Sequence, residues 1–167
     1  MIGGSKPPEA LGEYTGFLLT WVAARGRDRF AAAMAELDLR PQHFAALTVI
    51  AAHPGGTQQE LVSATGIDPS TMVQIIDELE AAGLAERRIH DSDRRKRAIH
   101  LTPEGTRLLG RARVVVGRVA DELFAALSPQ ERATLNGLLR RMAGLPEQEK
   151  STATRASRPT VGRSPEG

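Results

Sequence analysis

Apolar residues recur at helical spacing along most of this chain. Between Glu9 and about Leu37 they are separated by three or four positions, which predicts one long helix with a weak point at Gly26. Asp38-Leu39-Arg40-Pro41 interrupts the pattern, and Pro41 suits the first turn of a second helix over 41–52. The first third of the chain is therefore expected to be helical.

Residues 57–83 predict two shorter helices joined by a tight turn. Thr57 and Glu60 have the spacing of a capping box, in which each side chain accepts the other residue's amide. Gly66 ends this first helix, and Asp68-Pro69 supplies an N-cap and a first-turn proline for the next one. The segment thus has the plan of a helix-turn-helix.

The second of these helices has two distinct faces. At 100° per residue its apolar side chains share one side, namely Met72, Ile75, Ile76 and Leu79. The opposite side carries Ser70, Gln74, Asp77 and Ala81, flanked by Thr71 and Val73. The first set is expected in the core and the second is free to meet a partner.

A basic hairpin is expected directly after this helix. Residues 84–101 read as two short alternating strands around the charged turn DSDRR, and a new helix starts at Thr102-Pro103-Glu104-Gly105. Residues 84–100 hold six Lys and Arg against three acids, whereas residues 68–83 hold four acids and no base. The uneven distribution matters more than the net charge of +2.

A helix-turn-helix followed by a basic wing predicts a double-stranded DNA interface, since every neutralised phosphate releases counterions. The first helix would bring its N-terminal Thr57, Gln58 and Gln59 to the DNA backbone. The second would enter the major groove with Pro69, Ser70, Thr71, Val73 and Gln74. Gln74 is the best base reader, because an amide can bond an adenine edge in bidentate fashion.

The wing supplies the remaining DNA contacts in this interpretation. Arg95 is the natural probe of a narrow minor groove, where negative potential is concentrated. Asp93 can hold Arg95 by a hydrogen bond, and Arg94 and Lys96 would follow phosphates. The acids Asp77, Glu78 and Glu80 are expected to lean away from the groove or to pair with wing arginines.

Composition removes several other classes of function. The chain has no cysteine, which excludes disulfides, thiolate metal sites and thiol sensors and suits a reducing cytoplasm. No apolar run is long enough to cross a membrane, and the polar start predicts no secretory signal. No phosphate loop, nucleophile elbow or HExxH motif occurs, so neither catalysis nor a cofactor is expected.

Five segments in order resemble the MarR family of transcriptional regulators in residue type and spacing. They are Gln58-Gln59-Glu60-Leu61, Gly66-Ile67-Asp68-Pro69-Ser70-Thr71, Gly83-Leu84, Asp93-Arg94-Arg95 and Leu101-Thr102-Pro103-Glu104-Gly105, and the resemblance covers roughly residues 10–143. It implies a homodimeric winged helix-turn-helix repressor of a pseudo-palindromic operator, released by a small molecule. The family's Asp-x-Arg pair falls on Asp93 and Arg95. Gln74 departs from the arginine often found there, so operator preference is not carried over.

The expected fold is mainly α-helical with a small β-wing. Residues 1–8 read as a flexible start, 9–145 as the winged helix-turn-helix domain, and 146–167 as a disordered tail. Within the domain, 57–105 form the DNA-binding lobe and 9–37 and 103–143 are dimerisation helices. The last segment reads as a helix over 103–127 and, after a second capping box at Ser128 and Glu131, a helix over 129–142. Their apolar residues exceed what one lobe can cover, and a two-fold dimer would set its recognition helices about 34 Å apart.

Two further sites are weighed against simpler explanations. Trp21, Arg25 and His43 could line a pocket for a small anionic or aromatic effector, which the resemblance implies, but Trp21 as core and Arg25 as a surface ion-pair partner is the favoured alternative. The four histidines include no helical metal-binding pair, although His90 and His100 could face each other across the wing. A metal site is therefore not expected.

The alternative function is a winged helix that binds DNA architecturally and senses nothing, or one that contacts only proteins. Salt dependence separates DNA binding from protein contact, because phosphate contacts weaken steeply with salt.

Overall fold

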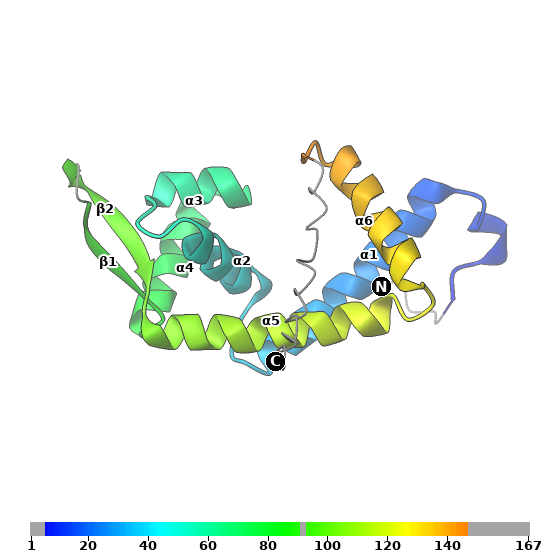
Figure 1. Ribbon diagram of the computed structural model, residues 1–167, viewed down its shortest axis with the longest axis horizontal. Coiled ribbons are helices and arrows are strands. Elements are labelled where there is room, and N and C mark those ends of the chain that lie inside the picture. The colour runs from blue at the N-terminus through cyan, green and yellow to red at the C-terminus, as the bar shows by residue number, and fades with distance from the viewer. Residues whose placement is uncertain (1–5, 91–92, 147–167) are drawn as a thin grey trace, which may run out of the picture. The chain divides into compact units, whose positions relative to one another are not determined.

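The computed structural model describes residues 6–90 and 93–146, except for the side chains of residues 90 and 93–95. It divides into two compact units, Met1–Ala125 and Ala126–Gly167. The elements follow the order η1 (Glu9–Leu11, a 3-10 turn), α1 (Thr15–Ala35), α2 (Pro41–Ala52), α3 (Gln58–Thr65), α4 (Pro69–Ala81), β1 (Ala85–His90), β2 (Asp93–Leu101), α5 (Pro103–Leu123) and α6 (Pro129–Met142). The predicted mainly helical fold with a small wing is confirmed (Figure 1).

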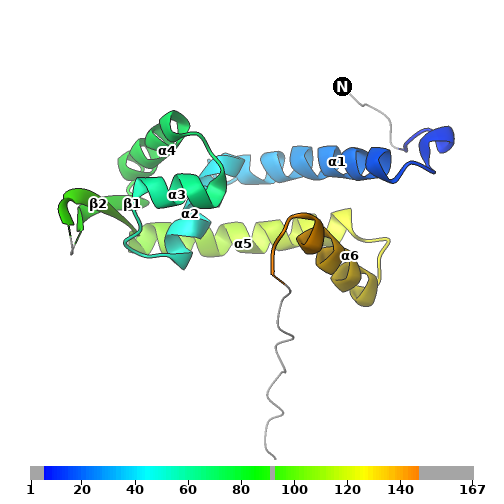
Figure 2. The same cartoon turned by 90° about the horizontal axis from the view of Figure 1, so that it is seen from above.

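In the first unit, α1 and α5 run side by side in opposite directions (Figures 1 and 2). Gly26 does not loosen α1, which is continuous through it. A Cβ at Gly26 would lie 2.9 Å from Cδ2 of Leu123 on α5. The missing side chain therefore lets the two helices approach closely.

Three predicted boundaries were wrong. The long first helix starts at Thr15 and not at Glu9, because a 3-10 turn and the bend at Gly12 precede it. Helix α5 ends at Leu123 instead of continuing to residue 127. The hairpin turn is shorter than DSDRR, since β2 already begins at Asp93.

The predicted caps are confirmed, and they explain why the helices start where they do. Thr57 and Glu60 form the expected capping box, in which the Thr57 amide donates to Glu60 Oε2 at 2.7 Å. Asp68 caps α4, with Pro69 in its first turn. Gly66 ends α3 at a positive φ of 70°, a conformation that glycine adopts without strain.

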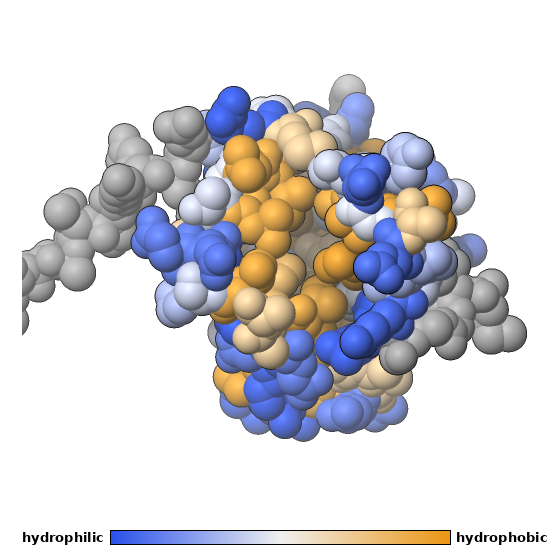
Figure 3. Space-filling view, turned by 90° about the vertical axis from the view of Figure 1, so that its right-hand side faces the viewer, coloured by the Kyte–Doolittle hydropathy of each residue, from blue (hydrophilic) through white to orange (hydrophobic). Residues whose placement is uncertain are grey.

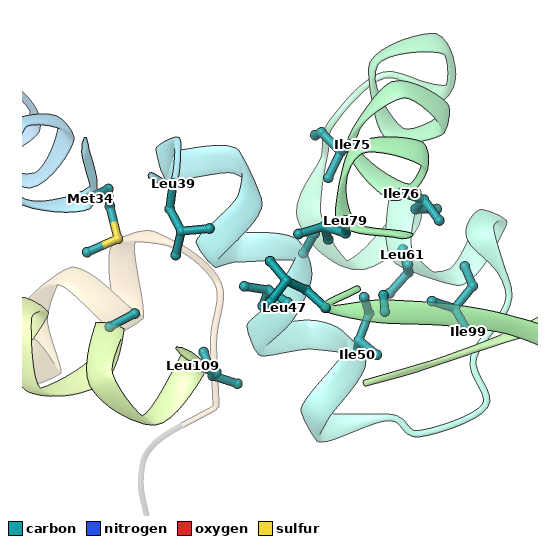
Figure 4. Close-up of a cluster of buried hydrophobic side chains, with 14 of the residues drawn as sticks. Met34, Leu39, Leu47, Ile50, Leu61, Ile75, Ile76, Leu79, Ile99 and Leu109 are labelled. Atoms are coloured by element: carbon teal, nitrogen blue, oxygen red, sulfur yellow. The ribbon is translucent and has the colours of Figure 1, made fainter. Parts of the chain in front are cut away.

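The core of the first unit lies where α2 meets α4, α5 and the end of α1 (Figure 4). Leu47 and Ile50 of α2 are fully buried there, as are the four apolar residues predicted for α4. Phe44 and Val49 are only partly buried against this cluster. Ile99 brings the base of the wing into the same core.

The wing is an antiparallel pair in which Ala85 lies opposite Leu101 and Ile89 opposite Arg97. The register shifts after Ile89, so that His90 pairs with Asp93. The expectation that His90 and His100 face each other was wrong, because this bulge and the register place Glu86 opposite His100.

The loop before α3 is joined to the wing by an isolated β-bridge between Gly56 and Ile99. Gly55 donates its amide to the Ile99 carbonyl at 3.0 Å, and Ile99 donates back to Gly56 at 2.9 Å. Because both hydrogen bonds lie at the base of β2, the wing is fixed to the start of the helix-turn-helix.

Helix α5 begins against the end of the helix-turn-helix. Thr102 caps it by accepting the Gly105 amide at 3.0 Å, and its hydroxyl donates to the Gly83 carbonyl at 2.7 Å. A Cβ at Gly105 would overlap the Leu84 carbonyl oxygen. Only glycine therefore permits this packing.

The second unit contains α6. Ser128 and Glu131 form the second predicted capping box, with the Ser128 amide donating to Glu131 Oε2 at 2.8 Å. Leu138, Leu139 and Met142 are exposed on this helix. The tail predicted to be disordered lies outside the described residues from position 147 onward.

Apolar surface is also exposed on the first unit. Leu19 and Val22 of α1 and Val114 of α5 are exposed. Figure 3 shows apolar side chains among polar ones on one face of the molecule. Apolar surface of this kind commonly marks an interaction site.

Within the described ranges, no helix is long and apolar enough to span a membrane. The same residues contain no group of three or more His, Asp or Glu that could hold a metal ion.

Candidate nucleic-acid interface

Helix α4 presents one face to solvent and buries the other. Met72, Ile75 and Ile76 are fully buried. Val73, on the opposite side, is 38% exposed although its side chain is aliphatic. The outward face therefore mixes polar groups with one apolar contact point, as a base-reading surface requires.

The start of α4 is fixed by Asp68. Its Oδ1 accepts the Ser70 hydroxyl at 2.6 Å and the Thr71 amide at 2.9 Å. These hydrogen bonds, that of Ser70 first, hold the pKa of the Asp68 carboxyl well below its usual range. Ser70 and Thr71 are thereby held at the exposed entrance of the helix.

One flank of α4 is tied to the start of α2. His43 Nε2 lies 2.7 Å from Glu78 Oε2, and Arg40 pairs with the same carboxylate. Because the Arg40 amide donates to His43 Nδ1 at 3.2 Å, Nε2 is the ring nitrogen that donates to Glu78. This hydrogen bond, followed by the Arg40 charge, lowers the pKa of Glu78.

The other flank of α4 is tied to the wing through Arg87 of β1. The Arg87 amide donates to Glu80 Oε1 at 2.7 Å, and its guanidinium pairs with Glu80 as well. The same Nη1 lies 2.7 Å from Asp77 Oδ1. Asp77 and Glu80 thus pair with a wing arginine as predicted, while Glu78 turns toward α2.

A basic cleft lies between α3 and the wing. Its volume is about 300 Å³, and it is lined by Thr57, Gln58, Gln59, Arg87, Lys96, Arg97 and Ile99. Arg87 is already paired with Asp77 and Glu80, but Lys96 and Arg97 add positive charge to the cleft, which suits a phosphate group.

The structure brings several of the sequence-predicted residues together. Thr57, Gln58, Gln59 and Lys96 meet in the cleft. Arg94, Arg95 and Asp93 lie in β2 near the turn, but their side chains are outside the described part of the structure. Sequence reasoning did not single out Arg87 or Arg97, because a basic run does not reveal which cations face α3.

The three effector candidates are not grouped by the described contacts. His43 lies against Glu78, and Trp21 is 7% exposed with its ring 6.0 Å from that of Phe17. Helix α1 meets α2, which carries His43, at the end where Met34 lies. Trp21 is about 20 Å from Met34 along α1, at about 1.5 Å per residue. His43 therefore has a clear role in fixing α4, and the effector role of Trp21 and Arg25 stays a prediction.

Comparison with known proteins gives a consistent result. The sequence profile of the MarR family matches residues 37–96, which include α2, the helix-turn-helix and most of the wing. A protein assigned as transcriptional regulator of the hcr operon in Thauera aromatica is 39% identical over 102 residues. That alignment covers 61% of this chain and 61% of that relative, so the chain spans less than two thirds of its length.

A second relative and two solved structures are matched more completely. The transcriptional regulator HosA of Escherichia coli O111:H- is 30% identical over 105 residues, covering 63% of this chain and 78% of HosA. The repressor CouR bound to a 23-mer DNA duplex aligns with a TM-score of 0.74 and 31% identity, over 84% of this chain and 99% of CouR. CouR from Rhodococcus jostii RHA1 bound to p-coumaroyl-CoA aligns with a TM-score of 0.72 and 29% identity, over 85% and 100% of the two chains.

Proposed function

This chain belongs to the MarR family of DNA-binding transcriptional regulators, and we propose that it is a homodimeric repressor that binds a pseudo-palindromic operator and is released by a small effector. It would act in the cytoplasm, where the operator lies. The proposal rests on the family and on the geometry of α4 and the wing.

The observation that carries the proposal is the outward face of α4. Val73 is exposed beside Gln74, on a helix whose two flanks are hydrogen-bonded to α2 and to the wing. A rigid helix with an aliphatic group next to an amide suits the major groove, where a thymine methyl and an adenine edge can be adjacent.

In this proposal each predicted contact residue has a role. The N-terminal part of α4 would read bases with Pro69, Ser70, Thr71, Val73 and Gln74. Thr57, Gln58, Gln59, Arg94 and Lys96 would hold phosphates, and Arg95, supported by Asp93, would enter the minor groove. Base contacts then specify the operator, while the cleft and the wing position the lobe.

The homodimer is proposed on the exposed apolar surface of α1, α5 and α6. A second copy would cover side chains such as Val22 and Val114 that one chain leaves in water. A two-fold axis would also repeat the recognition helix about one DNA turn away, near 34 Å.

Effector release is proposed on the likeness to CouR, which has been solved with p-coumaroyl-CoA. Trp21 and Arg25 would offer an aromatic face and a cation to an anionic or aromatic ligand. Binding would favour a dimer whose recognition helices no longer match the operator.

The experiment is a selection of genomic fragments by the purified full chain at about 150 mM salt, close to physiological ionic strength. Enrichment of a pseudo-palindrome with half-sites one turn apart would support a sequence-specific dimeric regulator. Adding aromatic acids and their coenzyme A thioesters to the bound complex then tests release.

The second candidate function, an architectural DNA binder that senses nothing, predicts a different result in this selection. It would retain fragments without a shared sequence, and its binding would decrease with salt in the same way on all of them. That outcome would contradict the repressor proposal.

A further inference from the structure

Asp77 is the one acid on α4 that lies within its outward face. The buried residues Met72, Ile75 and Ile76 fix the inward direction of this helix. At 100° per residue, Asp77 then lies almost opposite them and one turn beyond Gln74. Its side chain is 57% exposed, on the face proposed to enter the major groove.

Glu78 and Glu80 have different surroundings. They lie on the two flanks of α4, where Glu78 faces Arg40 and His43 and Glu80 holds both the backbone and the side chain of Arg87. Their hydrogen bonds fix the helix in the lobe. Asp77 contributes little to that fixation, because Glu80 already holds Arg87.

Arg87 fixes the direction of the Asp77 carboxylate without neutralising the group. Its Nη1 lies 2.7 Å from Asp77 Oδ1 and also contacts Glu80. One guanidinium thus faces two carboxylates, which leaves a net negative charge. The other Asp77 oxygen has no partner within the ranges that the structure describes, and it can accept a hydrogen bond.

A carboxylate in the major groove is costly unless it meets a donor, because the DNA phosphates repel it. Guanine and thymine present only acceptors or a methyl group on their major-groove edges. Adenine has an amino group, but its N7 acceptor lies beside it. Cytosine presents the N4 amino group alone, and it is the base edge that best fits a single carboxylate.

We propose that Asp77 is a specificity-determining residue that accepts a hydrogen bond from a cytosine N4 amino group in each half-site, with Arg87 as its positioning residue. This proposal rests on the proposed function and adds a base contact to it. It also gives the recognition helix a means of reading a C·G pair, which Gln74 alone does not supply.

The test is a selection from randomised half-sites with four full-length proteins, namely wild type, D77A, R87Q and the control E86A. Glu86 is an exposed acid on β1 that pairs with Arg88, so its removal changes the charge of the same lobe equally. Alanine suits an exposed helix position, and circular dichroism checks that each variant is folded.

Wild type and E86A should share a cytosine preference at one position of the half-site. D77A should lose about tenfold of that preference, the scale of a base-specific hydrogen-bonded contact, while its affinity for random DNA stays equal or rises. R87Q should weaken the preference at the same position, besides lowering affinity for every sequence.

Two outcomes overturn the proposal while the regulator function stands. In the first, D77A selects the same bases as wild type at every position. In the second, D77A loses preference evenly along the half-site, which means that Asp77 only braces the helix. If wild type itself enriches no sequence, the proposed function fails and this inference fails with it.

Discussion

At the scale of single residues, backbone geometry depends on a few positions that tolerate no alternative. Gly105 is buried at the start of α5, with the Leu84 carbonyl oxygen in the space where a Cβ would stand. Asp68 fixes the first turn of α4 by accepting two hydrogen bonds, from the Ser70 hydroxyl and the Thr71 amide. Each gives a prediction that isolates one physical effect.

Replacing Gly105 with alanine should destabilise the protein by about 3 kcal/mol, at the upper end of ordinary overpacking costs. The first turn of α5 must shift away from Leu84 to make room. Urea unfolding followed by circular dichroism measures the change.

The matched control is Gly110→Ala, on an exposed position of α5 where a Cβ meets nothing within 4 Å. That variant should gain about 0.5–1 kcal/mol, because alanine loses less backbone entropy than glycine in a helix. Equal destabilisation of both variants would contradict the steric argument.

The low pKa of Asp68 predicts a pH effect on stability. The ionised carboxylate is favoured in the folded state, so its contribution is complete above the ordinary Asp pKa of about 3.9. Below that pH the unfolded chain takes up a proton before the folded chain does, and the contribution declines. Asp68→Asn keeps a capping oxygen that does not titrate.

The comparison of wild type with Asp68→Asn removes the titration of all other carboxylates, which both proteins share. The wild-type advantage in urea midpoint should be constant from pH 7 to about pH 5 and should shrink as the pH falls toward 3. A difference that does not change over this range would refute the assigned role of the cap.

At the scale of elements, the sequence predicted the helix boundaries that depend on neighbouring residues. The capping residues Thr57, Asp68 and Ser128 and the terminator Gly66 act on neighbouring residues, so α3, α4 and the start of α6 could be located from their signals. The end of α5 was missed because residues 124–127 are apolar and carry no stop signal.

The parts of the candidate site that escaped prediction depend on distant partners. Glu78 meets Arg40 and His43, residues more than 30 positions earlier in the chain. The cleft forms only when β2 lies against α3, which no run of basic residues reveals. The outward face of α4 was predictable, since periodicity alone sets it.

The wing as an element predicts a loss of operator affinity on replacement of Arg95 with alanine. The expected cost is about 1–3 kcal/mol, the scale of one specific contact, and it should be largest on operators with an A·T-rich flank. Fluorescence anisotropy at constant salt measures it, with Arg113→Ala on the exposed side of α5 as the charge-matched control. Unchanged affinity of the Arg95 variant would exclude minor-groove insertion.

At the scale of the whole molecule, one chain leaves apolar side chains exposed on its long helices and on α6. Their burial by a second copy would make stability depend on protein concentration, as in any dimer whose halves support each other. The proposed dimer therefore has a direct thermodynamic signature besides its mass.

Removal of residues 147–167 should leave both folding and dimerisation intact, because that segment has only Val161 as a large aliphatic residue. Light scattering after size exclusion gives the mass of the truncated protein, and thermal melts at two concentrations give its stability. A monomeric or less stable product would mean that the tail is part of the structure.

The two hydrogen bonds that join Ile99 to Gly55 and Gly56 fix the base of the wing to the loop before α3. We therefore expect a force that DNA applies at the tip of the hairpin to rotate the hairpin and α3 together, without bending the hairpin at its base. The Gly55 and Ile99 amides should then exchange with deuterium slowly and at a common rate, since both hydrogen bonds break only when the wing separates from this loop. Strain between the two half-sites would be transmitted to the helix-turn-helix through these two hydrogen bonds. The match between the spacing of the wings and the spacing of the grooves would therefore help to set how tightly the lobe binds.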